Sequence, residues 1–506
     1  MTHPDVRIAT SEPHVLPSAQ HGPNPQGLSA SLYNNDLAPT TKAGRTWSSY
    51  SIFTLWANDV HSLGNYAFAI GLFALGLGGW QILLALGFGA LLLFGLLNFS
   101  GFMGEKTGVP FPVMSRIAFG IRGAQIPALL RGAVAIAWFG IQTYLASVVL
   151  VVMILAVAPS AAGLNSNSFL GLSALGWICF VALWALQLVI VSYGMEMIRK
   201  YEAFAGPVIL VTMGALAVWM FTRAGGSIAW STGNTKTGLD MWLGILGGGA
   251  LWVSIYGTFV LNFCDFTRSA KSKGSIVRGN FWGIPLNMLL FGVIVVVMTG
   301  AQFKIDGTII DSPSDVVAAI PNTFLLLAAS AALLILTVAV NLMANFVAPI
   351  YALTNLFPKV LNFRRAGIIS GVIGLLILPW NLYNSPAVIT YFLGGLGALL
   401  GPLFGIIMAD YWILRRAKIN IPDLYRSTPK GTYYFTRGVN FRAILALGIS
   451  AIAALILAFS PALGNVSAFA WFIGSALGAL IYLVIAKRGQ VHQDIDGEAI
   501  AVAPAH

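Results

Sequence analysis

The sequence predicts an all-α integral membrane protein that crosses the bilayer with twelve helices. Of its 506 residues, 57% are hydrophobic and only 9% are charged, whereas soluble domains usually carry about 25% charged residues. The apolar residues form runs of roughly 20, which is the length that crosses a bilayer as a helix. Glycine is abundant, with 55 residues, and small residues allow membrane helices to pack closely. These observations exclude a soluble enzyme.

The predicted helices follow one another along most of the chain. Their approximate limits are 50–77, 81–102, 125–157, 169–193, 203–222, 239–264, 279–301, 321–350, 366–384, 387–414, 441–460 and 465–486. We expect residues 1–47 and 488–506 to form polar cytoplasmic tails, without a cleavable signal peptide at the start. Between the tails, we expect two groups of five helices, 48–224 and 238–416, and a final pair within 440–487.

Positive charges gather in alternate connections between these helices. The even-numbered connections contain Lys106, Arg116, Arg122, Arg199, Lys200, Arg268, Lys271, Lys273, Arg278, Lys359, Arg364, Arg365 and the basic run 415–442. The other side contains only Arg223, Lys236 and Lys304. The positive-inside rule therefore places both termini in the cytoplasm of a plasma or inner membrane. We attribute the net charge of +11 to topology and expect no nucleic-acid partner, because no nucleic-acid-binding motif accompanies it.

The first apolar span contains a polar interruption. It consists of Asn58, Asp59, His61, Ser62, Gly64 and Asn65. A polar break at membrane depth is tolerated only where protein buries it or where it lines a watery cavity. An ionisable residue there is a functional-site hypothesis by default. Asp59 could instead be a structural cap that accepts hydrogen bonds from backbone N–H groups at the break, and both interpretations stay open.

The sixth span also has a weak centre. Gly244, Gly247, Gly248 and Gly249 precede residues 251–258 there. Interrupted helices at corresponding positions of two halves indicate the central site of a transporter, and five helices per half would give the halves opposite orientations. The alternative is that these glycines only allow tight packing.

Several motifs resemble the nucleobase:cation symporter family one. They occupy residues 108–113, 116–123, 127–132, 138–143, 341–345, 378–380, 400–405, 409–411 and 423–425. The resemblance extends from about residue 45 to 460 and implies a permease for hydantoin, uracil, allantoin, cytosine or a related compound. It also implies a five-plus-five inverted repeat of the leucine-transporter type, with helices one and six broken and two additional C-terminal helices.

Trp138 and Gln142 are the leading candidates for substrate recognition. They are four residues apart and therefore lie on one face of the third helix. A flat heterocycle needs an aromatic ring for stacking and an amide that matches its C=O and N–H edge. The resemblance implies that these positions are the family's stacking tryptophan and ring-reading glutamine. Their alternative role is packing in the helix core.

Further candidates come from the alignment that the resemblance implies. Tyr256 falls at the family's second stacking aromatic, although Trp252, four residues earlier, leaves the register open. Asn345 matches an asparagine that hydrogen-bonds substrate, or else bridges two helices. Ser62 takes the position of a polar residue that faces the ligand. His61 and Asn65 flank Ser62 and join the candidate substrate site.

The coupling ion is the point at which the sequence departs from the family. Sodium-coupled relatives use backbone carbonyls of the first helix, here Asn58 and His61, and positions of the eighth helix. The eighth-helix positions are Leu336, Ala339 and Val340, so that Ala339 and Val340 replace the expected serine and threonine. Thr337 is one residue out of register, which rotates it by about 100°.

We therefore expect proton coupling, with sodium-coupled or uncoupled uptake as alternatives and no cofactor or firm metal site. Asp59 and His61 are the groups most open to protonation, because histidine titrates near neutral pH and an aspartate at membrane depth must be paired, protonated or hydrated. Lys200 and Glu202 at the start of the fifth helix are interpreted as topology residues. Asp265 and Arg268, which end the sixth helix, are expected to form an ion pair.

The predicted function is import of a nucleobase-like heterocycle by alternating access. We favour uracil or a related pyrimidine, followed by allantoin or hydantoin, with cytosine or a purine possible. We expect a monomer whose only other partner is the lipid bilayer. The glycine-rich start of the tenth helix is predicted to act as a gate, and it contains Tyr391, Leu393, Gly394, Gly395 and Gly397. A membrane enzyme would need a nucleophile–base set or a metal cluster, and a channel would need a continuous polar pore.

Overall fold

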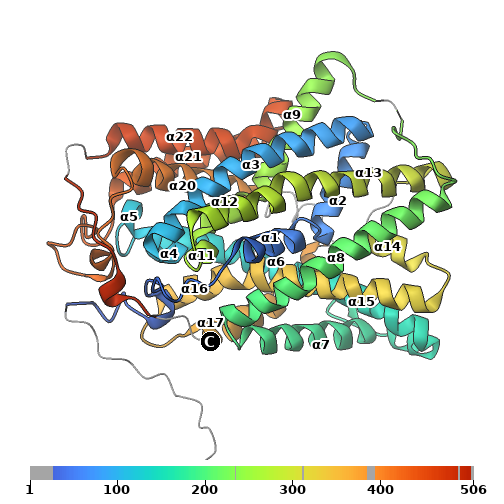
Figure 1. The fold of residues 1–506 in the computed structure, drawn as a ribbon, viewed down its shortest axis with the longest axis horizontal. Coiled ribbons are helices and arrows are strands. Elements are labelled where there is room, and N and C mark those ends of the chain that lie inside the picture. Colours follow the sequence, from blue (N-terminus) through green and yellow to red (C-terminus); the bar gives the residue numbers. More distant parts are fainter. Residues whose placement is uncertain (1–26, 234, 310–312, 384–393, 488–490, 503–506) are drawn as a thin grey trace, which may run out of the picture.

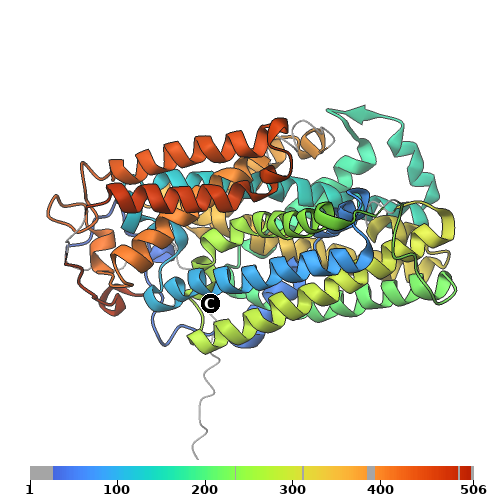
Figure 2. The same cartoon turned by 90° about the horizontal axis from the view of Figure 1, so that it is seen from above.

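The computed structural model describes residues 27–233, 235–309, 313–383, 394–487 and 491–502. This part of the chain is a layered bundle of long helices that run in broadly similar directions (Figures 1 and 2). The long helices are α3 (Gly79–Thr107), α6 (Gln125–Val157), α7 (Ala174–Val191), α8 (Met195–Arg223), α9 (Gly238–Ile255), α13 (Asn287–Asp306), α15 (Thr323–Val340), α20 (Gly394–Met408), α21 (Phe441–Phe459) and α22 (Ala470–Ile485).

Shorter elements connect or extend these helices. They are α1 (Ser49–Asp59), α2 (Leu63–Ala74), α4 (Phe111–Met114), α5 (Arg116–Phe119), α10 (Gly257–Asn262), α11 (Cys264–Thr267), α12 (Lys273–Phe281), α14 (Pro313–Ala318), α16 (Val347–Leu356), α17 (Phe363–Leu376) and α18 (Pro379–Tyr383). A small antiparallel hairpin of β1 (Ser168–Phe169) and β2 (Leu172–Ser173) precedes α7.

Ten helical stretches within the described ranges are long and apolar enough to cross a membrane. They correspond to ten of the twelve predicted helices, so the prediction of a multi-pass all-α membrane protein is confirmed. The two exceptions are the first and ninth predicted helices. In the structure, the first is divided into α1 and α2, and the ninth is the 14-residue helix α17.

The first span is interrupted at residues 60–62, inside the predicted polar segment. Helix α1 ends at Asp59, and Ser62 begins α2 as an N-cap whose hydroxyl accepts a hydrogen bond from the backbone N–H of Asn65. The side-chain amide of Asn65 donates to the carbonyls of Asp59 (2.8 Å) and Val60 (3.3 Å). Polar side chains therefore satisfy backbone groups that the break frees, as a membrane interior requires.

The sixth span is interrupted at Tyr256 rather than among the four glycines predicted to weaken it. Helix α9 continues through Gly244–Gly249 and ends at Ile255, and α10 begins at Gly257. A Cβ atom on Gly249 would lie 2.8 Å from the carbonyl oxygen of Ala85 in α3. These glycines therefore lie in a continuous helix, and Gly249 allows α9 to pack tightly against α3, which is the alternative that the sequence left open.

The remaining helices pack in groups around the two interrupted spans. Helices α20, α21 and α22 contact one another and lie along one edge of the molecule in Figure 1. Helix α6 contacts α7, α15 and α16, and helix α8 contacts α1, α13 and α15. The two interrupted spans lie between these groups, and the central site is built around them.

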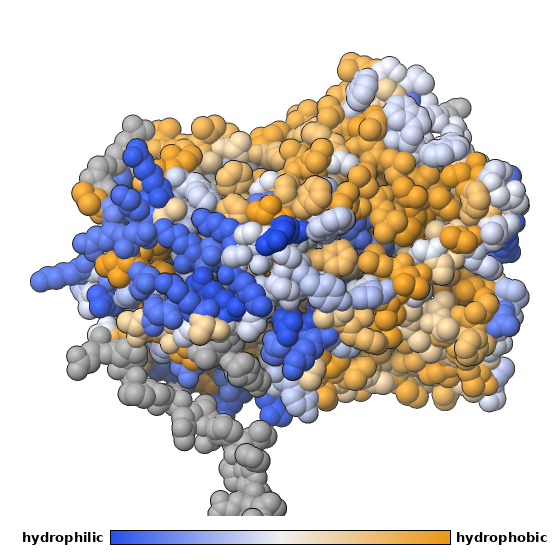
Figure 3. All heavy atoms as spheres, in the orientation of Figure 1, coloured by the Kyte–Doolittle hydropathy of each residue, from blue (hydrophilic) through white to orange (hydrophobic). Residues whose placement is uncertain are grey.

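One end of the bundle is polar and holds both described chain ends. Figure 3 shows hydrophilic residues over this end and a largely hydrophobic surface beyond it. Backbone bridges join Thr40 to Val502 and Asn420 to Ile495. Because the two tail segments pair directly, they lie on the same side of the molecule.

Buried arginines fasten the N-terminal segment to this end. Arg116 donates to the carbonyls of Leu32 (3.1 Å) and Leu424 (2.7 Å). Arg268 donates to the Thr40 hydroxyl (3.0 Å) and to the carbonyls of residues 36 and 38.

The ion pair expected between Asp265 and Arg268 is not formed. Asp265 accepts hydrogen bonds instead from the backbone N–H of Phe111 (2.6 Å) and the side-chain amide of Asn262 (2.7 Å). Arg268 is directed toward backbone carbonyls of the N-terminal segment, as described above. The prediction was wrong because it considered neighbours along the helix and could not include that segment.

Candidate substrate site

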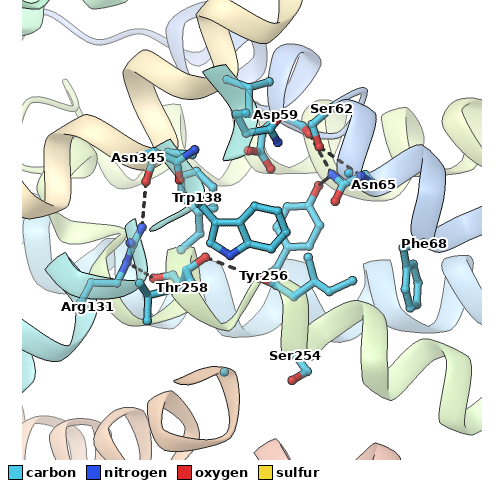
Figure 4. A pocket seen from close by; sticks show the side chains of 18 of the residues that line it. Asp59, Ser62, Asn65, Phe68, Arg131, Trp138, Ser254, Tyr256, Thr258 and Asn345 are labelled. Carbon is cyan, nitrogen blue, oxygen red and sulfur yellow. Dashed lines mark hydrogen bonds between the residues drawn. The ribbon is translucent and has the colours of Figure 1, made fainter. Parts of the chain in front are cut away.

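A cavity of about 550 Å³ lies at the centre of the bundle, between the two interrupted helices. Figure 4 shows the side chains around it. Its lining residues are Asp59, Ser62, Gly64, Asn65, Phe68, Arg131, Val134, Trp138, Gln142, Leu251, Ser254, Ile255, Tyr256, Thr258, Phe259, Val340, Ala344, Asn345 and Gly397. The cavity is mainly apolar with a few polar groups, which is typical of sites for small organic ligands.

Trp138 and Gln142 lie together on the face of α6 that lines the cavity. The first turn of α2 packs against them, since a Cβ atom on Gly64 would lie 3.8 Å from the Trp138 ring and 3.7 Å from Gln142 Nε2. Gln142 is only 4% exposed, and its Oε1 atom is buried without a hydrogen-bond partner among the described residues. An unpaired buried acceptor costs about 1–3 kcal/mol, so this oxygen is poised to accept a hydrogen bond from a ligand.

Tyr256 and Asn65 connect the two interruptions on another side of the cavity. Tyr256 is the single residue between α9 and α10, and its hydroxyl accepts a hydrogen bond from the Asn65 amide at 2.9 Å. Both residues line the cavity, as does Ser62 at the start of α2. The ring of Tyr256 therefore provides an aromatic surface, while Asn65 fixes its position.

Trp252 lies outside the cavity. It is fully buried, does not line the cavity, and its ring stacks with Phe68 and Phe291 at centroid distances of 5.4 and 5.5 Å. Its indole N–H points to the sulfur of Met288 at 3.1 Å. Of the two aromatic residues that the sequence left as alternatives, Tyr256 is the one at the cavity.

Asn345 reaches the cavity from a π-helical segment, Asn341–Phe346, between α15 and α16. Its amide donates to Asn341 Oδ1 at 2.8 Å, and Asn341 donates in turn to Gln187 Oε1 (2.7 Å) and Thr143 Oγ1 (2.9 Å). Widened turns of this kind are frequent at functional sites. The chain of hydrogen bonds fixes the Asn345 side chain relative to α6 and α7.

His61 is buried away from the cavity. Its ring nitrogens contact the Tyr66 hydroxyl (2.8 Å) and Asn287 Oδ1 (3.2 Å), and its ring packs edge-on against Phe291. Because both nitrogens are engaged and the residue does not line the cavity, its side chain connects the break to α13 rather than to the cavity.

The neighbouring residues Asp59 and Asn58 face different ways. Asp59 lines the cavity, where its carboxylate interacts with the Tyr256 hydroxyl and with the charge of Arg131. Asn58 is fully buried, and its amide donates to Glu202 Oε2 in α8 at 2.6 Å. The end of α1 thus presents one polar side chain to the cavity and the next to the interface with α8.

The positions aligned with sodium ligands contribute no hydroxyl group. Leu336, Ala339 and Val340 are buried in α15, and Val340 lines the cavity. The Thr337 hydroxyl is directed along its own helix, where it donates to the Leu333 carbonyl at 2.7 Å. The side chains at this locus are therefore apolar or already hydrogen-bonded.

Two buried charged residues were not singled out from the sequence as site residues. Arg131 lines the cavity and is 2% exposed; it donates to the carbonyls of Ala344 (3.0 Å) and Thr258 (3.3 Å) and to Asn262 Oδ1 (3.2 Å). Glu202 is buried beside Asn58. The sequence did contain one indication of a functional role for Arg131: it is a charged residue within the apolar span 125–157, and charges at membrane depth are usually functional.

Only part of the predicted gate at the start of the tenth helix falls within the residues that the structure describes. Tyr391 and Leu393 lie outside the described residues. Gly397 is in the first turn of α20 and lines the cavity. The backbone of α20 therefore approaches the site at this glycine.

Comparisons with known proteins identify close relatives of the whole chain. The chain is 35% identical to the allantoin permease of Bacillus subtilis over 465 residues, which cover 91% of this chain and 94% of the relative. It is also 35% identical to the purine-uracil permease NCS1 of Arabidopsis thaliana over 429 residues, covering 84% of this chain and 72% of the relative. Both relatives are permeases, in agreement with the transporter predicted from the sequence.

A solved structure has the same overall arrangement. It is that of Mhp1, a nucleobase-cation-symport-1 family transporter, in a closed conformation with bromovinylhydantoin bound. The TM-score is 0.74 at 26% identity, over 89% of this chain and 94% of that chain. This match confirms the predicted class of an all-α membrane transporter fold, while the twelve-helix count and the inverted repeat stay predictions.

The family model for permeases of cytosine/purines, uracil, thiamine and allantoin matches residues 39–474. This range includes the interrupted helices, the cavity and every motif on which the resemblance was based. The resemblance is therefore confirmed, and the chain belongs to the nucleobase:cation symporter family of membrane permeases.

Proposed function

We propose that this permease imports a small, flat heterocycle that presents adjacent C=O and N–H groups, and that it works by alternating access. The observation that carries the proposal is the buried, unpaired Oε1 of Gln142 beside the Trp138 ring. A heterocycle stacked on Trp138 would place its N–H edge against this oxygen and its carbonyl against the amide nitrogen. One side chain would then read both groups.

Other cavity residues complete this proposed site. Tyr256 offers a second aromatic surface, and Asn345 offers its carbonyl oxygen, because its amide already donates to Asn341. Ser62 and Asn65 supply polar groups from the break. We exclude Trp252 and His61 from the direct contacts, since neither lines the cavity.

Uracil and allantoin are the two substrates that we put forward for testing. Both carry the alternating C=O and N–H groups that Gln142 can match. The names of the relatives support the choice, since one is an allantoin permease and the other a purine-uracil permease. Hydantoin, cytosine and purines are the wider panel.

We propose that uptake is coupled to protons rather than to sodium. Sodium prefers oxygen ligands, and Ala339 and Val340 offer no hydroxyl where sodium-coupled relatives have them, while the Thr337 hydroxyl is engaged by Leu333. Asp59 supplies an ionisable carboxyl at the cavity wall. Sodium-coupled and uncoupled uptake are the alternatives.

We also propose a topology for the chain in the membrane. The basic connections place the polar end, with both termini, in the cytoplasm of a plasma or inner membrane. The two halves would occupy residues 48–224 and 238–416, with residues 440–487 as an added pair of helices in a monomeric transporter. Cysteine accessibility at an introduced site in the loop 415–440 would test the orientation.

Counterflow in proteoliposomes tests the transport function. Vesicles containing the purified protein are loaded with unlabelled uracil or allantoin and diluted into the labelled compound. We expect transient accumulation of label with at least one member of the panel. Absence of counterflow across the whole panel would contradict the proposal, whereas conductance without counterflow would indicate a channel.

A further inference from the structure

Glu202 is a buried carboxyl group that the proposed substrate site does not use. It lies in the second turn of α8 and is 2% exposed. Its Oε2 accepts the hydrogen bond from Asn58 Nδ2 at 2.6 Å, but Oε1 is buried without a partner among the described residues. The Oδ1 atom of Asn58 is buried and unpaired in the same way.

This environment does not suit an ionised carboxylate. An ionised carboxylate has about four acceptor sites, and one amide donor serves Glu202 through its side chain. A buried charge is costly unless it is paired and hydrogen-bonded. A protonated carboxyl group removes the charge and turns the unpaired Oε1 atom into a hydrogen-bond donor.

The charged and titratable groups around Glu202 reinforce this preference. In α1, the charge of Asp59 repels that of Glu202, and the Tyr50 hydroxyl donates to the Ala203 carbonyl at 3.1 Å. Helix α15 contains no ionisable residue, and α7 contains only Cys179. In α13, Lys304 and Asp306 lie near Arg223, about 30 Å along α8 from Glu202.

Residues of α8 itself do not neutralise Glu202 either. Arg199 forms an ion pair with Glu196 at 2.5 Å, and Lys200 is exposed. The Tyr201 hydroxyl donates to the Ile335 carbonyl at 3.2 Å. The charges close to Glu202 along the helix are therefore engaged elsewhere or directed to solvent.

Helices α1 and α8 pack closely beside Glu202. A Cβ atom on Gly206 would lie 3.3 Å from Ala57 Cβ and 3.4 Å from Thr54 Cβ. Helices α1 and α8 therefore approach closely one turn beyond Glu202, and Figure 1 shows them side by side. A proton on Glu202 is enclosed as long as α8 stays against α1.

We propose that Glu202 is the proton-binding site of the transport cycle, and this rests on the proton coupling proposed above. While α8 is separated from α1 and open to one side of the membrane, the carboxyl group takes one proton from water onto Oε1, and α8 then packs on α1 around it. When α8 separates from α1 toward the other side, Glu202 becomes hydrated and releases that proton there. No other bond forms or breaks.

Asn58 provides a short structural link between Glu202 and the cavity. Asn58 donates a hydrogen bond to Glu202, and the next residue, Asp59, lines the cavity. Loss of the proton would leave a carboxylate on Glu202 near the carboxylate of Asp59, and like charges disfavour the packed state. Substrate binding and proton binding would therefore act on the same short segment of α1.

The test uses full-length wild type, Glu202→Gln and Glu202→Asp in proteoliposomes, with exposed Lys200→Gln as the matched control. An internal pH dye reports substrate-driven proton entry, and counterflow reports exchange. We expect the proton signal in wild type and Lys200→Gln. In Glu202→Gln, which resembles the protonated state, we expect counterflow to continue while the proton signal and gradient-driven accumulation fall at least tenfold.

Each other outcome has a defined meaning. A full proton signal in Glu202→Gln would overturn the inference. Counterflow in wild type without any proton signal would overturn proton coupling, and with it this inference, while leaving the substrate site in place. Strict dependence on sodium that disappears in Glu202→Gln would assign a metal cation to the site and contradict a proton.

A spectroscopic measurement covers the case in which Glu202→Gln does not fold. Infrared difference spectra of the wild type should contain the C=O stretch of a protonated carboxylic acid. Glu202→Asp retains the acid but changes its length and hydrogen bonding, so this band should shift. An unshifted band in folded Glu202→Asp, or no such band in the wild type, would overturn the inference.

Discussion

The side-chain amide of Asn65 donates a hydrogen bond to the hydroxyl of Tyr256 at 2.9 Å and so joins the two interrupted helices directly. The same amide donates to the carbonyls of Asp59 and Val60 at the end of α1. One residue therefore connects the break of the first span to the junction of α9 and α10. A displacement of either span would alter the aromatic wall of the cavity.

Replacing Asn65 by alanine should destabilise the protein and weaken substrate binding. The change leaves two backbone carbonyls and the Tyr256 hydroxyl without their donor, and an unsatisfied buried group costs about 1–3 kcal/mol. We expect a lower melting temperature in detergent and weaker binding of uracil or allantoin. Asn167→Ala, at an exposed position, should change neither, and a wild-type melting temperature in Asn65→Ala would contradict this role.

Tyr256 and Trp252 should respond differently to substitution. Tyr256→Leu removes an aromatic face from the cavity, and aromatic stacking on a base contributes about 1–3 kcal/mol, so the substrate Kd should rise about tenfold. Trp252→Phe removes packing against Phe68 and Phe291. It should lower the melting temperature without changing Kd. The opposite assignment would follow if only Trp252→Phe weakened binding.

Replacing sodium by choline should leave the uptake rate unchanged at constant pH. The reason is that Ala339 and Val340 supply no hydroxyl ligand, and the Thr337 hydroxyl is engaged in its own helix. Initial uptake rates of labelled substrate into proteoliposomes provide the measurement, with an imposed pH gradient as the comparison. Uptake that requires sodium and ignores the pH gradient would refute proton coupling.

Arg131 should be essential for the structure around the cavity. Arg131→Ala leaves the carbonyls of Thr258 and Ala344 and the Asn262 side chain without their guanidinium donor. Arg131→Lys should restore the fold only in part, because an ammonium group lacks the planar fork of donors. We expect a lower melting temperature in both variants, and more so in Arg131→Ala. Exposed Arg278→Ala is the control, and a wild-type melting temperature in Arg131→Ala would contradict the role.

The sequence predicted the fold class and the first interruption well, because both depend on polarity along the chain. Polar residues from Asn58 to Asn65 in an apolar span have few structural explanations. The sixth span was harder, since glycine serves tight packing as readily as a break. Gly249 packs against α3, and the interruption falls seven residues later at Tyr256.

The residues of the site were predicted in part, because residue type and spacing are visible in the sequence whereas packing between distant helices is not. Trp138, Gln142, Tyr256, Asn345 and Asp59 line one cavity. Trp252 does not, because its ring packs against Phe68 and Phe291 instead. Glu202 looked like a topology residue at a helix start, and its burial depends on the packing of α1, which has no signature near residue 202.

Binding of radiolabelled uracil and allantoin to the purified wild type and to Gln142→Ala is the most direct test of the central claim. Each hydrogen bond lost contributes about 1 kcal/mol, and 1.4 kcal/mol corresponds to a tenfold change. We therefore predict that the wild type binds at least one of the two compounds and that Kd rises at least about tenfold in Gln142→Ala. The control variant Gln302→Ala, at a residue that does not line the cavity, should keep the wild-type Kd. Equal Kd values for the wild type and Gln142→Ala would contradict the account.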